Sequence, residues 1–141
     1  MQKLQGIAVS PGVAIGEAFV LDNEGFRIPR RFVARDAVDS EVERLGRAFD
    51  ETRAQAERHR DTVSRELGSQ YAAIFEAHVQ MLSDPRLRQE LDESIRTRHY
   101  SPEYAVSRVL RRYAKVFQSL DSSFLAERSN DIIDIERRLL Q

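Results

Sequence analysis

Apolar side chains recur at alternating spacings of four and three along the segment from Ala37 to Leu67. This spacing places them on one face of an α-helix and is typical of a seam between packed helices. At 1.5 Å per residue the predicted helix is roughly 45 Å long and needs several neighbours. Two of the seam positions, Thr52 and His59, are polar, which indicates a more hydrated part of the helix as readily as a functional site. Gly68 is expected to end the helix. The seam positions are Val38, Val42, Leu45, Phe49, Thr52, Ala56, His59 and Val63.

A second predicted helix carries a histidine within an apolar stripe. The stripe consists of Tyr71, Ile74, Phe75, His78, Val79 and Leu82. Two interpretations remain open from the residues alone. His78 is either a core histidine whose ring is satisfied by a neighbour, or part of a surface on which a partner docks.

Three further helices follow, with clear start signals. Asp84-Pro85 and Ser101-Pro102 each combine an N-cap residue with a proline at the first helical position, and Asp121 is expected to cap the last helix. Short connections between five helices predict an antiparallel bundle of two helical hairpins. The expected inner positions are Leu87, Leu91 and Ile95, then Val106, Val109, Leu110, Tyr113, Val116, Phe117 and Leu120, and finally Phe124, Leu125, Ile132, Ile135 and Leu139.

The N-terminal segment has a different character. Residues Gly6–Leu21 predict a β-hairpin around a Pro11-Gly12 turn, because proline favours the first central turn position and glycine accepts the positive φ of the second. Residues Asp22–Arg35 predict an extended connector. The expected fold class is therefore mainly α, with a short N-terminal β-hairpin.

Composition narrows the function classes. The chain has 141 residues, 41% of them hydrophobic, with 22 basic and 23 acidic residues. This balance favours neither nucleic acid nor a membrane as a partner. The absence of cysteine excludes disulfides and thiolate metal sites. We expect a cytoplasmic protein, because the sequence shows no signal peptide and no segment of transmembrane length.

No catalytic constellation is evident. His59, His78 and His99 are not spaced to place two metal ligands on one helix face, and neither a phosphate-binding glycine loop nor a nucleophile elbow is present. By its residues the chain is predicted to be a binding module with no cofactor. Charged clusters at Arg108, Arg111 and Arg112 and at Glu136–Arg138 are expected to be solvated surface.

Several blocks in a fixed order carry a more specific signal. They are Ser10-Pro11-Gly12-Val13-Ala14-Ile15-Gly16, Ile74-Phe75-Glu76-Ala77-His78, Met81-Leu82-Ser83-Asp84 and Leu125-Ala126-Glu127-Arg128-Ser129-Asn130-Asp131. Over essentially the whole chain the sequence resembles the N-terminal region of Enzyme I, the phosphoenolpyruvate-protein phosphotransferase of the bacterial sugar phosphotransferase system.

The resemblance implies a function in phosphoryl transfer. In that family a histidine accepts phosphate from phosphoenolpyruvate and passes it to a histidine of the small carrier HPr. The accepting histidine lies in a glycine-rich Thr-Ser-His segment that this sequence does not contain, so we expect the chain alone to be inactive. Mg²⁺ is expected only for the full-length parent. The implied division is 1–35, strands and connector of a truncated α/β subdomain, and 36–141, the helical HPr-binding subdomain, with the remainder of Enzyme I as a partner in cis.

The resemblance also implies a docking surface, with Arg128 near the approach path of the phosphoryl group. The implied HPr-binding residues are Ala73, Ile74, His78, Met81, Asp84, Leu87, Leu125 and Arg128. The family's acidic residues around the second helix are reduced here to Asp84, and Arg86 reverses the charge, which suggests a specialised carrier. The alternative hypothesis is a stand-alone helical adaptor or coiled-coil interaction protein, suggested by the seam from Val38 to Val63.

Overall fold

The computed structural model describes residues 11–13, 15–16 and 27–141. Within them the chain forms a short 3-10 helix, η1 (Arg35–Ala37), and five α-helices. These are α1 (Val38–Leu67), α2 (Ser69–Leu82), α3 (Pro85–Arg98), α4 (Pro102–Gln118) and α5 (Ser123–Leu139). The predicted mainly helical class is confirmed. The predicted β-hairpin over Gly6–Leu21 lies for the most part outside the described residues, and the described part holds no strand beyond an isolated bridge between Phe32 and Tyr100.

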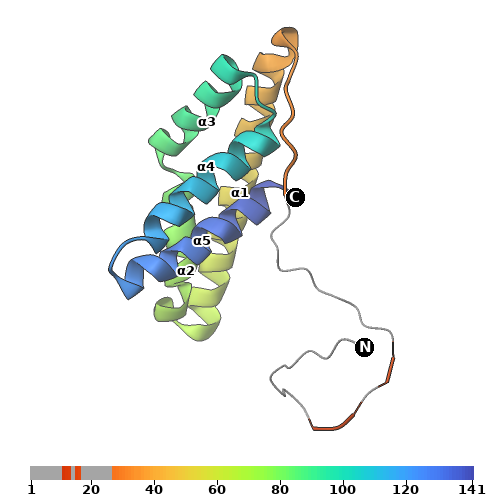
Figure 1. Ribbon diagram of the computed structural model, residues 1–141. Coiled ribbons are helices and arrows are strands. Elements are labelled where there is room, and N and C mark those ends of the chain that lie inside the picture. The colour runs from red at the N-terminus through yellow and green to blue at the C-terminus, as the bar shows by residue number, and fades with distance from the viewer. Residues whose placement is uncertain (1–10, 14, 17–26) are drawn as a thin grey trace.

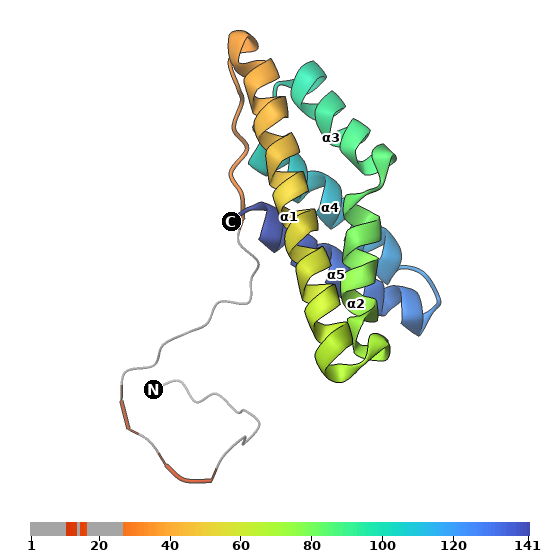
Figure 2. The ribbon, with the colours of Figure 1, turned by 180° about the vertical axis from the view of Figure 1, so that it is seen from behind.

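Helix α1 is the longest element and extends along the bundle (Figures 1 and 2). Helix α2 packs against its C-terminal half, α3 lies toward its N-terminal half, and α4 and α5 form a second helical hairpin (Figure 1). Helix α1 contacts all four of the other helices, so the prediction that it needs several neighbours is confirmed.

The helix boundaries follow the predicted capping residues in three cases. Gly68 ends α1 with a φ of 106°, a backbone angle that favours glycine. The side chain of Asp84 accepts a hydrogen bond from a backbone amide in the first turn of α3. Ser101 does the same for α4. These bonds satisfy amides that have no partner within the helix.

The prediction for the last helix boundary is wrong. Ser122, not Asp121, precedes α5, and its side chain makes no capping hydrogen bond. The chain between α4 and α5 takes an additional turn, in which the amide of Ser122 donates to the carbonyl of Leu120 at 2.7 Å. This turn moves the N-cap position one residue beyond the aspartate, to Ser122.

The connector before η1 is held against the junction between α3 and α4. The amide of Val33 donates to the carbonyl of His99 at 2.7 Å, and the amide of Ser101 donates to the carbonyl of Arg31 at 2.9 Å. His99 ends α3 in the left-handed conformation, with a φ of 55°. This conformation turns the carbonyl of His99 toward the connector, where it accepts the hydrogen bond from Val33.

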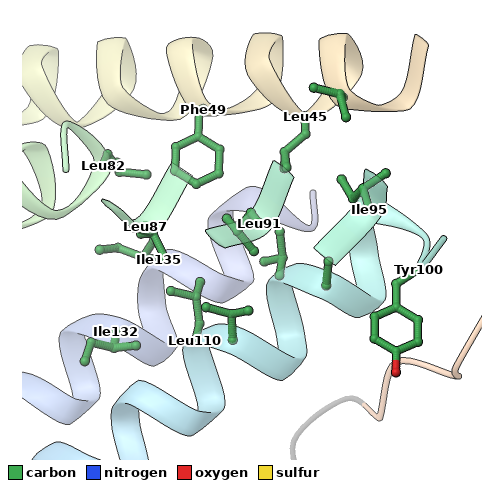
Figure 3. Close-up of a cluster of buried hydrophobic side chains, with 14 of the residues drawn as sticks. Leu45, Phe49, Leu82, Leu87, Leu91, Ile95, Tyr100, Leu110, Ile132 and Ile135 are labelled. Atoms are coloured by element: carbon green, nitrogen blue, oxygen red, sulfur yellow. The ribbon is translucent and has the colours of Figure 1, made fainter. Parts of the chain in front are cut away.

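The core includes residues of α1, α3, α4 and α5, with α3 packed against α1 and α4 (Figure 3). Leu91 and Ile95 of α3 are fully buried, and Leu45 and Phe49 of α1 lie across from them. The seam of α1 is buried from Val38 to Ala56, whereas His59 is exposed, so the wetter stretch lies at the C-terminal end of the helix. The other core members include Val42, Leu82, Leu87, Val106, Val109, Leu110, Ile132 and Ile135.

Some expected inner positions are exposed. Val116, Leu120 and Phe124 were predicted to face the bundle interior, but their exposed fractions are 52%, 44% and 59%. They lie at the end of α4 and the start of α5, next to the turn that joins the two helices. Periodicity gives the direction of a helix face, but it does not show where the neighbouring helix ends.

Two of the charged clusters expected to be solvated instead join helices. Arg111 of α4 donates to Glu136 of α5 at 2.9 Å, and the Glu136 side chain is only 4% exposed. Arg112 and Tyr113 of α4 both donate to Glu90 of α3. The helix contacts remove part of the hydration of the Glu90 and Glu136 carboxylates. The hydrogen bonds from the α4 side chains compensate for this lost hydration.

Truncating Leu91 to alanine is expected to destabilise the bundle by about 2–5 kcal/mol, because the side chain is fully buried where helices meet. Urea unfolding followed by circular dichroism measures this change. Leu67→Ala is the matched control, since Leu67 is exposed and its truncation should change stability by less than about 0.5 kcal/mol. Equal effects of the two substitutions would contradict the placement of the core.

Candidate functional site

Helix α2 presents two different faces. Ala72, His78 and Leu82 are buried against the bundle, whereas Tyr71 and Ile74 are exposed. The exposed positions of the helix carry no charged side chain; they are Ser69, Gln70, Tyr71, Ala73, Ile74 and Gln80. Helix α2 is therefore the element on which a buried histidine and an exposed apolar surface come close together.

The exposed large apolar residues from α1 onward lie near one end of the bundle. In both views the α1–α2 and α4–α5 turns lie at the same end of the molecule (Figures 1 and 2). Six large apolar residues that are between 42% and 64% exposed lie near these two turns. We call them the turn-end patch: Leu67, Tyr71, Ile74, Val116, Leu120 and Phe124.

Beside the α2–α3 junction lies a mainly apolar cavity of about 160 Å³. Met81, Asp84 and Leu87 form its α2–α3 wall. The opposite wall comes from α4 and α5. It consists of Leu110, Tyr113, Phe117, Ile132 and Ile135. Three of the predicted docking residues therefore share one cavity.

His78 lies beneath the surface. The residue is 2% exposed, and neither ring nitrogen has a hydrogen-bond partner among the described residues. Nε2 lies 3.8 Å from Oδ1 of Asp131 on α5, too far for a hydrogen bond. The ring also meets Phe75 edge-on, with 6.2 Å between ring centroids.

Asp131 lies between His78 and a partly exposed arginine. Oδ2 of Asp131 accepts a hydrogen bond of 2.9 Å from Nη1 of Arg128, one turn earlier on α5. The guanidinium carbon of Arg128 lies 4.8 Å from the ring centroid of Phe124, a member of the turn-end patch. A chain of contacts therefore runs from the buried histidine through Asp131 and Arg128 to the surface.

Burial lowers the pKa of His78 below its ordinary value of 6.5, because a charged imidazolium loses hydration inside the bundle. The negative charges of Asp131 and Asp134 act in the opposite direction but do not overcome desolvation, and Arg138 adds to the lowering. His78 is therefore neutral at pH 7.

The structure divides the predicted site residues into groups. Ala73 and Ile74 are exposed on α2. His78 is buried, which is the core interpretation of the two left open by the sequence, and it reaches Arg128 only through Asp131. The packing of α2 against α1 and α5 places this ring inside the bundle. Met81, Asp84 and Leu87 meet at the cavity. The side chain of Leu125 lies outside the described residues.

Sequence reasoning missed Asp131 and Phe124 as parts of this region. Asp131 follows Arg128 by three residues, a spacing that brings two side chains together on a helix and could have indicated the ion pair. Phe124 could not be distinguished from a core position without knowing where α4 ends.

Other chemistries receive no support from the described residues. No group of three or more histidine, aspartate or glutamate side chains within them is arranged to hold a metal ion. No helix in the described ranges combines the length and apolar character needed to cross a bilayer.

This arrangement of helices is similar to that in two solved structures of Enzyme I. A solved structure titled as an NMR solution structure of Enzyme I matches with a TM-score of 0.76 and 32% identity, covering 93% of this chain and 53% of that one. A second, titled as the N-terminal domain of Enzyme 1 – Nitrogen, matches with a TM-score of 0.75 and 29% identity, covering 81% and 47%.

Residues 5–128 match the family described as PEP-utilising enzyme, N-terminal, and the chain belongs to this family. Curated relatives named phosphoenolpyruvate-protein phosphotransferase include those of Priestia megaterium, 35% identical, and Staphylococcus carnosus, 31% identical. Each alignment covers 99% of this chain and 24% of the relative. The chain therefore spans about a quarter of the length of these relatives.

Stability is expected to fall as pH decreases from 6.5 towards 5. The unfolded chain protonates His78 near 6.5, whereas the folded chain resists protonation until a lower pH, so the unfolded state binds more protons in this window. The loss reaches at most about 1.4 kcal/mol per pH unit for one such group. Urea unfolding at several pH values measures it.

His78→Gln should remove most of this slope, because the amide does not titrate. His59→Gln is the matched control, since His59 is exposed on α1 and its replacement should leave the slope unchanged. An unaltered slope in His78→Gln would show that the pH dependence arises elsewhere.

Proposed function

We propose that this chain is the N-terminal part of a phosphoenolpyruvate-protein phosphotransferase and that its helical bundle docks the phosphocarrier HPr. In this proposal HPr exchanges a phosphoryl group with a histidine in another part of the parent enzyme. The observation that carries the proposal is the turn-end patch with Arg128 at its edge, in a chain of this family. The stand-alone adaptor hypothesis is not favoured, because the relatives align over nearly the whole chain.

The patch has the properties that a transient carrier site requires. Exposed aromatic and aliphatic side chains release water when a partner covers them, which supplies affinity. Ile74 and Phe124 offer this surface from two different helices. A carrier that must leave after each transfer needs only a limited apolar area surrounded by polar residues.

Arg128 supplies the charge that a phosphoryl group requires. Its side chain is 27% exposed, and its guanidinium is oriented by the ion pair with Asp131 and by the ring of Phe124. A planar guanidinium can bind phosphate oxygens with two parallel hydrogen bonds. A fixed cation beside the patch can therefore stabilise the charge of a carrier phosphohistidine as it approaches.

The cavity at the α2–α3 junction supports the same proposal. It is lined mainly by apolar residues and has Asp84 at its wall, so an apolar side chain of the carrier could enter it while a basic group contacts the carboxylate. The predicted docking residues Met81 and Leu87 act in this proposal as cavity walls, and Ala73 and Ile74 act as exposed surface.

The proposal also covers how this chain belongs to the full-length enzyme. We infer that residues 36–141 form the HPr-binding subdomain, that residues 1–35 belong to an α/β subdomain, and that Mg²⁺ is required only in other parts of the enzyme. A cytoplasmic location is consistent with exchange between two proteins.

Binding of HPr should shift the amide signals of residues 69–87 and 124–131 in a chemical-shift titration of the labelled chain. Phe124→Ala should weaken binding by about 5–30-fold, the effect of losing an aromatic anchor worth roughly 1–2 kcal/mol. Phe32→Ala is the matched control. Phe32 is a similarly exposed phenylalanine with the Arg30 guanidinium 5.2 Å from its ring centroid, but it lies beside Tyr100.

The control should bind HPr with unchanged affinity. Shifts that cluster around Phe32 and Tyr100, or equal weakening by the two alanine substitutions, would place the carrier elsewhere. The absence of any binding would overturn the proposal.

Incubation with isotopically labelled phosphoenolpyruvate should leave this chain unlabelled, because none of His59, His78 and His99 is proposed to accept the phosphoryl group. Mass spectrometry under conditions that preserve phosphohistidine measures the outcome. A phosphorylated histidine in the chain would contradict the assignment of the acceptor to another part of the enzyme.

A further inference from the structure

His78 is unusual among the polar groups of the bundle. Buried polar atoms normally have a hydrogen-bond partner, and those that lack one require an explanation. Both ring nitrogens of His78 are buried without a partner among the described residues, although a carboxylate oxygen lies 3.8 Å from Nε2. A small approach of the two groups would create a hydrogen bond, and a second proton on the ring would make that bond charge-assisted and therefore stronger.

That carboxylate is already engaged on its other side. Asp131 uses Oδ2 to accept the hydrogen bond from Arg128, while Oδ1 faces the ring of His78. Its side chain is 10% exposed, so its charge is compensated by protein groups more than by water. Any event that draws Arg128 away leaves a poorly hydrated carboxylate in need of another cation.

Docking of a phosphorylated carrier is such an event. Arg128 is the outermost member of the contact chain, and its guanidinium lies over the exposed ring of Phe124. A phosphoryl group carries up to two negative charges and competes with Asp131 for the guanidinium. His78 is the group positioned to replace Arg128 as the partner of Asp131.

We propose that Asp131 is a positioning residue that holds Arg128 at the turn-end patch, and that docking of phosphorylated HPr is coupled to the uptake of one proton by His78. The proton comes from solvent and binds to Nε2, which then donates to Oδ1 of Asp131 as Arg128 turns to the phosphoryl oxygens. No covalent bond other than the new N–H bond forms or breaks in this step, and the hydrogen bond from Arg128 to Oδ2 of Asp131 is exchanged for hydrogen bonds from Arg128 to the phosphoryl oxygens. The inference rests on the proposed function and adds a proton coupling to it.

The other charged groups near His78 do not provide this replacement. Asp134 and Arg138 of α5 act on the ring in opposite directions, and both act from the same helix as Asp131. On the side of α1, the ring of Phe75 separates His78 from His59, whose ring centroid lies 5.6 Å from that of Phe75. Asp131 is the carboxylate that faces a ring nitrogen within 4 Å.

Calorimetric titration with phosphorylated HPr in pairs of buffers that differ in ionisation enthalpy counts the protons taken up on binding. At pH 7 the wild-type chain should take up a fraction of a proton, at most one per complex. Half a proton corresponds to binding that tightens roughly threefold for each pH unit downward. Unphosphorylated HPr should produce a smaller uptake, because it does not draw Arg128 away.

Two substitutions test the groups involved. His78→Gln should reduce the proton uptake to near zero. Asp131→Asn should abolish the uptake and also weaken the binding of phosphorylated HPr, because Arg128 loses its support. His99→Asn is the control. His99 also has a buried ring nitrogen without a hydrogen-bond partner among the described residues, but it lies at the end of α3, and its replacement should leave the uptake unchanged.

The outcomes separate the two proposals. If HPr does not bind in either form, the proposed function fails, and this inference fails with it. If phosphorylated HPr binds with no proton uptake, only the coupling is wrong. Should His78→Gln fail to fold, the ¹⁵N signals of the His78 ring in the wild-type chain decide the matter. They should change from the neutral to the protonated pattern as phosphorylated HPr is added, and an unchanged neutral pattern overturns the inference.

Discussion

The contact of α3 with the rest of the bundle is the constraint on which the structure depends. Helices α1 and α2 form one hairpin and α4 and α5 form another, and α3 occupies the space between α1 and α4 (Figures 1 and 3). Leu91 and Ile95 are buried completely in this junction. Water is excluded there from three helices at once, so the apolar area buried by α3 fixes the relative position of the two hairpins.

The same contact shapes the site. Leu87, at the start of α3, is a core residue and also a wall of the cavity beside the α2–α3 junction. Its position is determined by the Asp84 cap and the proline that follows, since these end one helix and begin the next within a few residues. The cavity and the core therefore cannot be altered independently.

Ion pairs specify how the second hairpin packs. Glu136 is almost completely buried and bonded to Arg111, and Glu90 receives hydrogen bonds from two residues of α4. Charged pairs of this kind add little stability after desolvation, but they strongly disfavour arrangements in which one partner is left alone. We interpret them as constraints on the register of α4 against α3 and α5.

The sequence predicted the helices well because local signals determine them. Spacing of apolar residues, proline after a capping residue and glycine at a terminus act within a few positions of one another, so α1, α3 and α4 begin or end where expected. The error at Asp121 arose because a turn of several residues offers more than one possible cap. The division 1–35 and 36–141 stays a prediction.

Tertiary contacts determine which residues are exposed and which are buried at several positions where the sequence pattern could not show it. Val116, Leu120 and Phe124 continue the helical stripes but extend beyond the neighbouring helices, and this feature depends on relative helix lengths. Glu136 belongs to a charged cluster in the sequence, yet the fold buries it. A polar residue next to a buried apolar one gives no local signal of its own burial.

The position of His78 changes how the candidate site is understood. A histidine within an apolar stripe suggests either core or surface, and the structure places it in the core while connecting it to the surface through Asp131 and Arg128. A buried imidazole cannot contact a carrier directly. It can, however, change its charge when an external anion competes for the arginine, because only one carboxylate separates them. The apolar face that buries the histidine thus keeps it neutral in the free protein, which is the condition required for proton uptake on docking.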